Sequence, residues 1–153
     1  PDGGGYWLVA SDGGVFAFGD AGYFGSAADV ALHRPVVGMA ATPDGRGYWL
    51  VASDGGVFTY GYAPFLGSLG GRPLVQPVVG VAVVPGRSGY WMVAADGGVF
   101  TFGAAPFLGS AVGAVQAPVV GMAATPDGGG YWVVAADGGV FTYGNAPFLG
   151  SAA

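Results

Sequence analysis

The apolar residues of this chain come in short runs that glycine, proline or aspartate interrupts. One run, Tyr48–Ala52, is followed by Asp54-Gly55 and then by a second run, Val57–Tyr60. Asp and Gly tolerate the positive φ angles of tight hairpin turns, so this pattern predicts two antiparallel strands joined by a hairpin. Helices are not predicted, because Gly and Pro recur too often for uninterrupted helical turns.

Two further runs complete a unit of four predicted strands. The turn Pro43-Asp44-Gly45 precedes the first run above, and Pro64 follows the second; proline suits an edge strand because it lacks a ladder donor. The central runs are apolar on both faces, which predicts sheets that other sheets cover on both sides. The predicted strands are Pro35–Thr42, Tyr48–Ala52, Val57–Tyr60 and about Phe65–Ser68.

The same unit occurs about four times along the chain. Its tryptophans are spaced by 42, 42 and 41 residues, and each follows a tyrosine and precedes an Asp-Gly-Gly-Val-Phe block. Residues 35–68 and 118–151 align without gaps and differ at only four of 34 positions, so one unit was duplicated. We place the repeats at about 1–34, 35–76, 77–117 and 118–153. The repeated structural residues are Trp7, Trp49, Trp91, Trp132, Asp12, Asp54, Asp96 and Asp137.

Four strands in about 42 residues are typical of a β-propeller blade. We therefore predict one all-β domain over residues 1–153, a β-propeller-like array of about four four-stranded antiparallel blades. The small residues of the first strand suit the crowded position beside the axis. The large Tyr, Trp and Phe side chains of the next two strands suit the wider space between blades.

The sequence from Pro35 to Ala52 resembles the inner two strands of NHL-type propeller blades. It is also similar to a Tyr-Trp-Leu-Val-Ala-Ser-Asp-Gly-Gly-Val-Phe repeat of secreted actinobacterial proteins, which often stands beside cell-wall-directed domains. The resemblance covers the whole chain and rests on structural motifs. It implies a propeller, a non-enzymatic role and an extracellular or cell-surface location, and it brings no catalytic residues with it.

The first blade should lack one strand. The run that opens the other units occurs at Pro35–Thr42, Pro77–Val84 and Pro118–Thr125, whereas the chain begins at Pro1-Asp2-Gly3, inside a turn. Three interpretations follow: a segment of a six- to eight-bladed propeller, an association of several copies, or a four-bladed ring in which the second strand is innermost. Pro1 is an unusual natural start, so we expect a processed chain or an excised segment.

The composition limits the classes of partner that we expect. Charged residues make up 8% of the chain against about 25% in an ordinary soluble domain, and the net charge is −5 with four scattered arginines. Phosphate binding draws on clustered Lys and Arg, so nucleic acid is not an expected partner. No apolar run approaches the length of a membrane span, so membrane insertion is not expected either. Cysteine is absent, which excludes disulfides and thiolate metal sites.

Three motifs have a chemical and a structural interpretation. The Asp-Gly-Gly turns each offer one carboxylate, too few for Ca²⁺, and are better explained as turns. The Tyr-Trp pairs could stack on sugars, but their apolar neighbours favour the core. His33, the single histidine, lies in a variable linker without a repeated partner, which favours a solvated loop residue over catalysis or metal binding. We therefore expect no catalytic residues, no metal site and no cofactor.

The repeats differ in two regions: the linkers Ala27–Arg34, Leu69–Gln76 and Ala111–Ala117, and the positions after the third strand, Asp20, Tyr62, Ala104 and Asn145. Differences among copies are where recognition is expected. In a propeller these linkers share one face with the Asp-Gly-Gly turns. The candidate ligand-binding residues are His33, Arg34, Arg72, Gln76 and Gln116.

The sequence therefore leads us to expect a non-enzymatic secreted or surface module for binding or scaffolding. The alternatives are a lectin-like module that binds cell-wall or other glycans, and a self-assembling ring or filament. The corresponding partners are other copies of the chain, further blades, or glycans.

Overall fold

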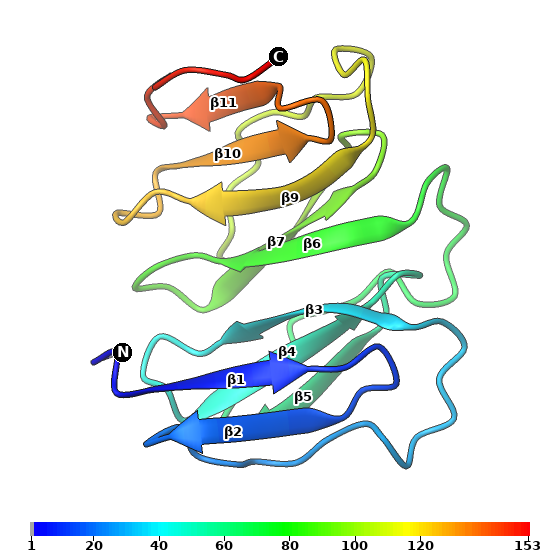
Figure 1. Cartoon of the computed structure of the whole chain (residues 1–153), viewed down its shortest axis with the longest axis vertical. Coiled ribbons are helices and arrows are strands. Elements are labelled where there is room, and N and C mark those ends of the chain that lie inside the picture. The colour runs from blue at the N-terminus through cyan, green and yellow to red at the C-terminus, as the bar shows by residue number, and fades with distance from the viewer. Residues whose placement is uncertain (1) are drawn as a thin grey trace.

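The computed structural model describes residues 2–153, which form eleven β-strands and no helix (Figure 1). The strands pair in four antiparallel sheets, one for each repeat, which we number 1 to 4 along the chain. The all-β, repeated architecture predicted from the sequence is thereby confirmed. Sheet 1 holds β1 (Gly5–Val9) and β2 (Val15–Gly19); sheet 2 holds β3 (Val36–Ala41), β4 (Gly47–Ala52) and β5 (Val57–Gly61); sheet 3 holds β6 (Val78–Val83), β7 (Gly89–Ala94) and β8 (Val99–Gly103); sheet 4 holds β9 (Val119–Ala124), β10 (Gly130–Ala135) and β11 (Val140–Gly144).

Each Asp-Gly-Gly segment forms the tight turn between two strands of its sheet. In sheet 2 the Gly56 N–H donates to Asp54 Oδ1 at 2.9 Å, and Gly55 has φ +77°. This turn sets a register in which Trp49 lies opposite Thr59. Successive residues of a strand point to opposite faces, so Tyr48 and Trp49 project to the two sides of the sheet.

The predicted fourth strand of each blade, near Phe65–Ser68 in the second repeat, is wrong. Over residues 2–153 the sheets have two or three strands, and this segment is irregular. Its carbonyl groups bond side chains instead of a neighbouring strand: Trp49 Nε1 donates to the Pro64 carbonyl at 2.7 Å, and the Tyr90 hydroxyl donates to the Gly67 carbonyl. The segment therefore carries the chain from one sheet to the next.

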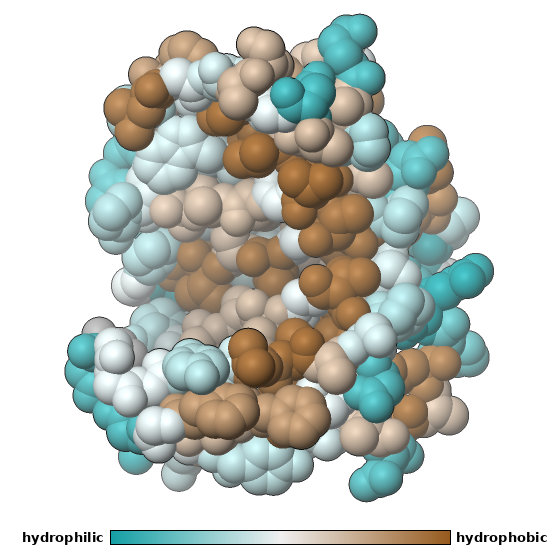
Figure 2. Space-filling view, in the orientation of Figure 1, coloured by the Kyte–Doolittle hydropathy of each residue, from teal (hydrophilic) through white to brown (hydrophobic). Residues whose placement is uncertain are grey.

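The first strand of each complete repeat is the innermost. The inner strands β3, β6 and β9 contact one another from sheet to sheet, and β1 contacts β3 (Figure 1). Their small residues, such as Gly38 and Ala40, permit this crowding. Figure 2 shows a band of apolar side chains over these strands. Val37 of β3 and Val120 of β9 are among the exposed apolar residues. The arrangement disfavours the interpretation in which the second strand is innermost.

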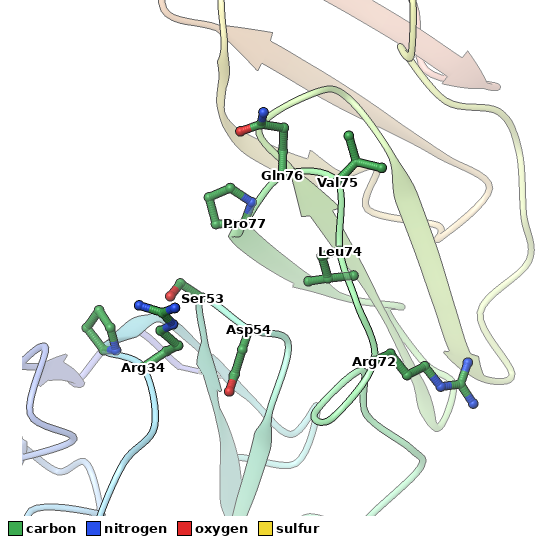
Figure 3. Close-up of a pocket in the computed structure, with 9 residues that line it drawn as sticks. Arg34, Ser53, Asp54, Arg72, Leu74, Val75, Gln76 and Pro77 are labelled. Carbon is green, nitrogen blue, oxygen red and sulfur yellow. The ribbon is translucent and has the colours of Figure 1, made fainter.

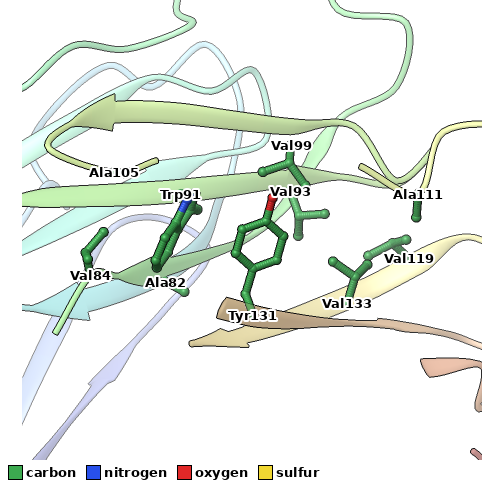
Figure 4. Packing of buried hydrophobic residues seen from close by; sticks show 10 residues of the cluster. All are labelled: Ala82, Val84, Trp91, Val93, Val99, Ala105, Ala111, Val119, Tyr131 and Val133. Atoms are coloured by element: carbon green, nitrogen blue, oxygen red, sulfur yellow. The ribbon is translucent and has the colours of Figure 1, made fainter. Parts of the chain in front are cut away.

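Successive sheets pack through two different faces, and we call each such contact a joint. The Trp face of one sheet carries its Trp and flanking valines, and the Tyr face of the following sheet carries its Tyr and the aromatic residues opposite. The ring centroids of the facing Trp and Tyr lie 5.8, 5.4 and 5.2 Å apart at the three joints of residues 2–153. Figure 4 shows the third joint, where Trp91 and Val93 of sheet 3 lie beside Tyr131 and Val133 of sheet 4.

The same hydrogen bonds recur at each joint. The hydroxyls of Tyr48, Tyr90 and Tyr131 each donate at 2.5 Å to a glycine carbonyl of the preceding repeat, those of Gly25, Gly67 and Gly109. Burial raises the pKa of these tyrosines above the ordinary value and keeps them neutral donors. The glycines also have positive φ angles between +124° and +133°, and a Cβ there would clash with an aromatic ring of the next sheet.

Candidate functional site

Three of the five candidate ligand-binding residues line one groove between sheets 2 and 3. Arg34, Arg72 and Gln76 border a hollow of about 540 Å³ at the end of the molecule that carries the linkers and the Asp-Gly-Gly turns (Figure 3). We call it the linker groove. It is lined by Arg34, Pro35, Ser53, Asp54, Arg72, Leu74, Val75, Gln76 and Pro77.

Backbone hydrogen bonds hold the walls of the linker groove in place. The Ser53 N–H donates to the Pro35 carbonyl at 2.9 Å, and the Val78 N–H donates to the Ser53 carbonyl at 2.8 Å. The turn that holds Ser53 thus ties together the chain beside Arg34 and the start of β6. The loop that ends at Gln76 is anchored at its other end, where the Leu69 N–H donates to the Gly55 carbonyl at 2.9 Å.

The linker groove combines several kinds of chemistry. Figure 3 shows the Arg34 guanidinium beside Ser53 on one side, and Leu74, Val75 and Gln76 on the other, while the Arg72 guanidinium points away from them. Val75 is 85% exposed, so its apolar side chain is accessible to a ligand. The groove therefore offers a cation, a hydroxyl, a carboxylate and an amide around an accessible apolar surface.

A second hollow of about 440 Å³ adjoins the linker groove. It lies on the other side of the loop Pro73–Gln76 and is bordered by Asp96 and by the exposed side chains of Phe107 and Val112. Leu74, Val75 and Gln76 line both hollows. The loop is therefore a ridge from which one extended ligand could contact both sides.

The other two candidates lie apart from these hollows. His33 and Gln116 are exposed on the linkers before β3 and β9, and neither is among the residues that line the linker groove or the second hollow. The predicted set is thus split by the fold. Sequence reasoning also missed Ser53, although a signal existed, because Ser53 is one of the four positions at which residues 35–68 and 118–151 differ.

Three of the four repeated Trp residues pack between sheets, and the repeated Asp residues stabilise the turns. Trp49 and Trp91 are almost fully buried, whereas Trp7 and Trp132 are half-buried. The aspartates Asp12, Asp54, Asp96 and Asp137 each accept the N–H of the glycine two residues ahead at 2.9 Å. One oxygen of each of these carboxylates, Oδ1, is therefore used by its own turn.

The opposite end of the molecule carries a set of related hollows, each beside a Trp. Their volumes are about 110, 300 and 320 Å³, and the lining includes Trp7, Trp49 and Trp132 respectively. Each combines its Trp with carboxylates of the neighbouring turns or with the variable residue after the third strand. We call them the Trp hollows.

The Trp hollow beside Trp132 holds a carboxylate with an altered pKa. Asp127 accepts the Gly129 N–H at 3.0 Å, the Thr125 hydroxyl at 2.7 Å and the Asn145 side-chain amide at 2.6 Å. These hydrogen bonds favour the charged form and lower the pKa of Asp127 to about 2. Asp127 therefore presents a negative charge at any physiological pH, oriented by the amide of Asn145.

Within residues 2–153, no group of three His, Cys, Asp or Glu residues is arranged to hold a metal ion. The same part of the chain contains no helix long and apolar enough to cross a membrane. No protein-family model and no curated protein matches this sequence.

Proposed function

We propose that this chain is a non-catalytic binding module of the β-propeller type, which recognises an extended ligand through the linker groove. The observation that carries the proposal is the convergence of variable residues. Arg34, Arg72 and Gln76 come from two linkers that differ in sequence, yet all three border one hollow on an otherwise repetitive scaffold. In repeat proteins, a rigid repeated framework commonly presents variable loops for binding.

The chemistry of the groove favours binding over catalysis. Ser53 lines the groove with Asp54, but His33 is not among the lining residues, so they form no nucleophile–base–acid arrangement. The mixture of Arg34, Gln76 and the apolar Val75 instead suits recognition of a chain that alternates polar and apolar groups. The low charge content and the resemblance to secreted repeats support an extracellular or cell-surface location for this module.

Binding should be measured on an array of random peptides and on a glycan array, with the chain labelled at its C-terminus. For any ligand that binds, Arg34→Ala combined with Gln76→Ala should weaken affinity by about fivefold to a hundredfold, because two hydrogen-bonding side chains are lost. His33→Ala combined with Gln116→Ala is the matched control, since both residues are exposed on linkers and neither lines the linker groove. Equal loss with the control variant, or catalytic turnover of a bound molecule, would contradict the proposal.

A second candidate function, glycan binding, is supported by the Trp hollows. The half-buried rings of Trp7 and Trp132 and the 74% exposed ring of Tyr62 give each of the three hollows an aromatic surface near a carboxylate, as in lectins that bind repeated sugars. A glycan that binds there should be released by Asn145→Ala or Tyr62→Ala and unaffected by Gln76→Ala. The opposite pattern would assign the glycan to the linker groove.

A further inference from the structure

The two terminal sheets each leave one apolar face uncovered. On sheet 1 the Tyr face is open, and its side chains Tyr6, Leu8, Phe16 and Phe18 are 57%, 53%, 55% and 43% exposed. The equivalent tyrosines of sheets 2, 3 and 4 are 0% exposed. Figure 2 shows apolar side chains on the surface over β1 and β2, at the lower end of this view.

On sheet 4 the Trp face is open. Trp132 and Val134 are half-buried, and Phe148 and Leu149 in the segment after β11 are 63% and 82% exposed. The equivalent leucines Leu66 and Leu108 pack into the joints that follow their repeats. Figure 1 places sheets 1 and 4 at opposite ends of the array, so the two open faces do not cover each other within one chain.

We infer that a second copy of this chain docks its sheet 1 onto sheet 4, forming a fourth joint between molecules. The two open faces are the same two kinds of face that pack together at the three internal joints. Their complementarity is thus shown three times within the molecule, by Trp7 on Tyr48, Trp49 on Tyr90 and Trp91 on Tyr131.

The acceptor for the incoming tyrosine is already in place. Gly150 has φ +122°, close to Gly25, Gly67 and Gly109 at +131°, +124° and +133°. A Cβ at each of those three glycines would meet an aromatic ring of the next sheet, whereas a Cβ at Gly150 meets nothing within 4 Å in the described residues. In the fourth joint, Tyr6 would donate its hydroxyl to the Gly150 carbonyl, and Phe18 would lie over Gly150.

Leu149 has an equally specific place. At two internal joints, Leu66 lies against Gly103 and Leu108 lies against Gly144. A Cβ built on either glycine would lie 2.8 Å from the leucine Cδ1. At the equivalent glycine of sheet 1, Gly19, the three atoms nearest to a Cβ all belong to the backbone of Gly4 and Gly5. Leu149 of one copy would therefore pack over Gly19 of the next.

This contact is heterologous, because it joins different faces of the two copies. Two copies joined at both ends would bring together eight sheets, which lies within the range of known propellers, so we expect a closed pair. Sheet 1 contributes two strands in the described residues, so the fourth joint involves fewer strands than the joints between the three-stranded sheets 2, 3 and 4. The expected affinity is accordingly moderate, and association should depend on concentration.

The first test is sedimentation velocity over a wide range of protein concentration. The expected result is a species of twice the chain mass of 15.0 kDa that dissociates on dilution. A monodisperse species of 15.0 kDa at every concentration would overturn the inference.

Two variants then locate the contact. Tyr6→Asp and Leu149→Asp each place a charge on one open face, so each variant alone should be monomeric. Val75→Asp is the matched control, because it makes the same charge change at an 85% exposed residue of the linker groove and should still assemble. Circular dichroism should show the same sheet content in all three, since the altered residues are exposed.

A mixture of Tyr6→Asp and Leu149→Asp distinguishes the head-to-tail contact from a symmetric one. The first variant retains an intact sheet 4 and the second an intact sheet 1, so mixing should give a complex of two chains through one joint. If Leu149→Asp still forms pairs by itself, or if the mixture stays monomeric, the head-to-tail contact is refuted.

The conservative variant Tyr6→Phe tests the predicted hydrogen bond. Loss of the hydroxyl should weaken association by about twofold to tenfold and leave the size of the assembly unchanged. An affinity equal to that of the unaltered chain would show that the Tyr6 hydroxyl does not reach Gly150. The proposed binding function is tested at the linker groove, which contains Val75, whereas this inference is tested at Tyr6, outside the groove. Each proposal can therefore fail while the other holds.

Discussion

At the scale of the residue, identical side chains differ in burial and contacts from one repeat to another. Tyr90 is fully buried and donates to Gly67, while Tyr6, in the same sequence motif, is 57% exposed. Trp91 and Trp132 both donate their Nε1–H to a proline carbonyl, those of Pro106 and Pro147, yet only Trp91 is fully covered. The motif therefore fixes which hydrogen bonds a residue can make. The presence of a neighbouring sheet decides how much the residue contributes to the free energy of unfolding.

The hydroxyl of Tyr90 allows the contribution of one such residue to the free energy of unfolding to be measured. Tyr90→Phe should lower the free energy of unfolding by about 1 kcal/mol, because a partly buried hydrogen bond to the Gly67 carbonyl is lost. Tyr62→Phe is the control, since Tyr62 is 74% exposed and should unfold like the unaltered chain. Urea denaturation followed by tryptophan fluorescence gives both values, and equal stabilities of the two variants would contradict the role assigned to Tyr90.

At the scale of the element, the second strand of each repeat carries most of the packing. In sheets 2 and 3 all six residues of β4 and β7 are buried, because both faces of these strands lie against another sheet. In sheet 4 the pattern of β10 alternates, with Trp132 and Val134 half-buried. The strands have nearly the same sequence, so the difference comes from stacking and not from strand propensity.

Matched tryptophan variants test this account. Trp91→Ala should lower the free energy of unfolding by about 3–5 kcal/mol, as expected for a large buried side chain. Trp132→Ala removes the same side chain and the same kind of hydrogen bond, yet should cost clearly less, because part of the ring already contacts water. Measurement at a protein concentration too low for association keeps the comparison to single chains. Equal costs at both positions would show that the joints are not the main source of stability.

At the scale of the whole molecule, the chain is a stack in which each sheet contacts its neighbours in sequence. Sheets 2 and 3 have neighbours on both faces, while sheets 1 and 4 have a neighbour on one. Sheet 1 also has two strands where the others have three in residues 2–153, and two-stranded sheets are marginally stable in water. Local stability should therefore vary along the stack.

Hydrogen exchange followed by mass spectrometry should reveal that variation. The amides of β1 and β2 should exchange fastest among the strands, and those of β4 and β7 slowest, since opening the latter breaks two joints. Raising the protein concentration should slow exchange in β1 and β2 if sheet 1 is covered by another copy. Uniform protection across the four sheets would mean that the array unfolds as one cooperative unit.

The sequence by itself determined the repeat, the all-β class, the hairpins and the first three strands of each complete unit. These depend on local signals, such as the alternation of Tyr48 and Trp49 and the turn at Asp54-Gly55, which act within a few residues. The predicted fourth strand failed, because Pro64 and Gly67 use their carbonyls on aromatic side chains, one of them from the next repeat.

Only the tertiary structure decided which residues meet across repeats. It brought Arg34 and Gln76, from different linkers, to one groove, left His33 and Gln116 outside it, and covered Tyr90 while leaving Tyr6 open. No local pattern can specify such outcomes, because they depend on how sheets stack over tens of residues and on which faces find a neighbour. The repeated sequence gives every sheet the same two packing faces. The position of a sheet in the stack decides whether a neighbouring sheet covers each face.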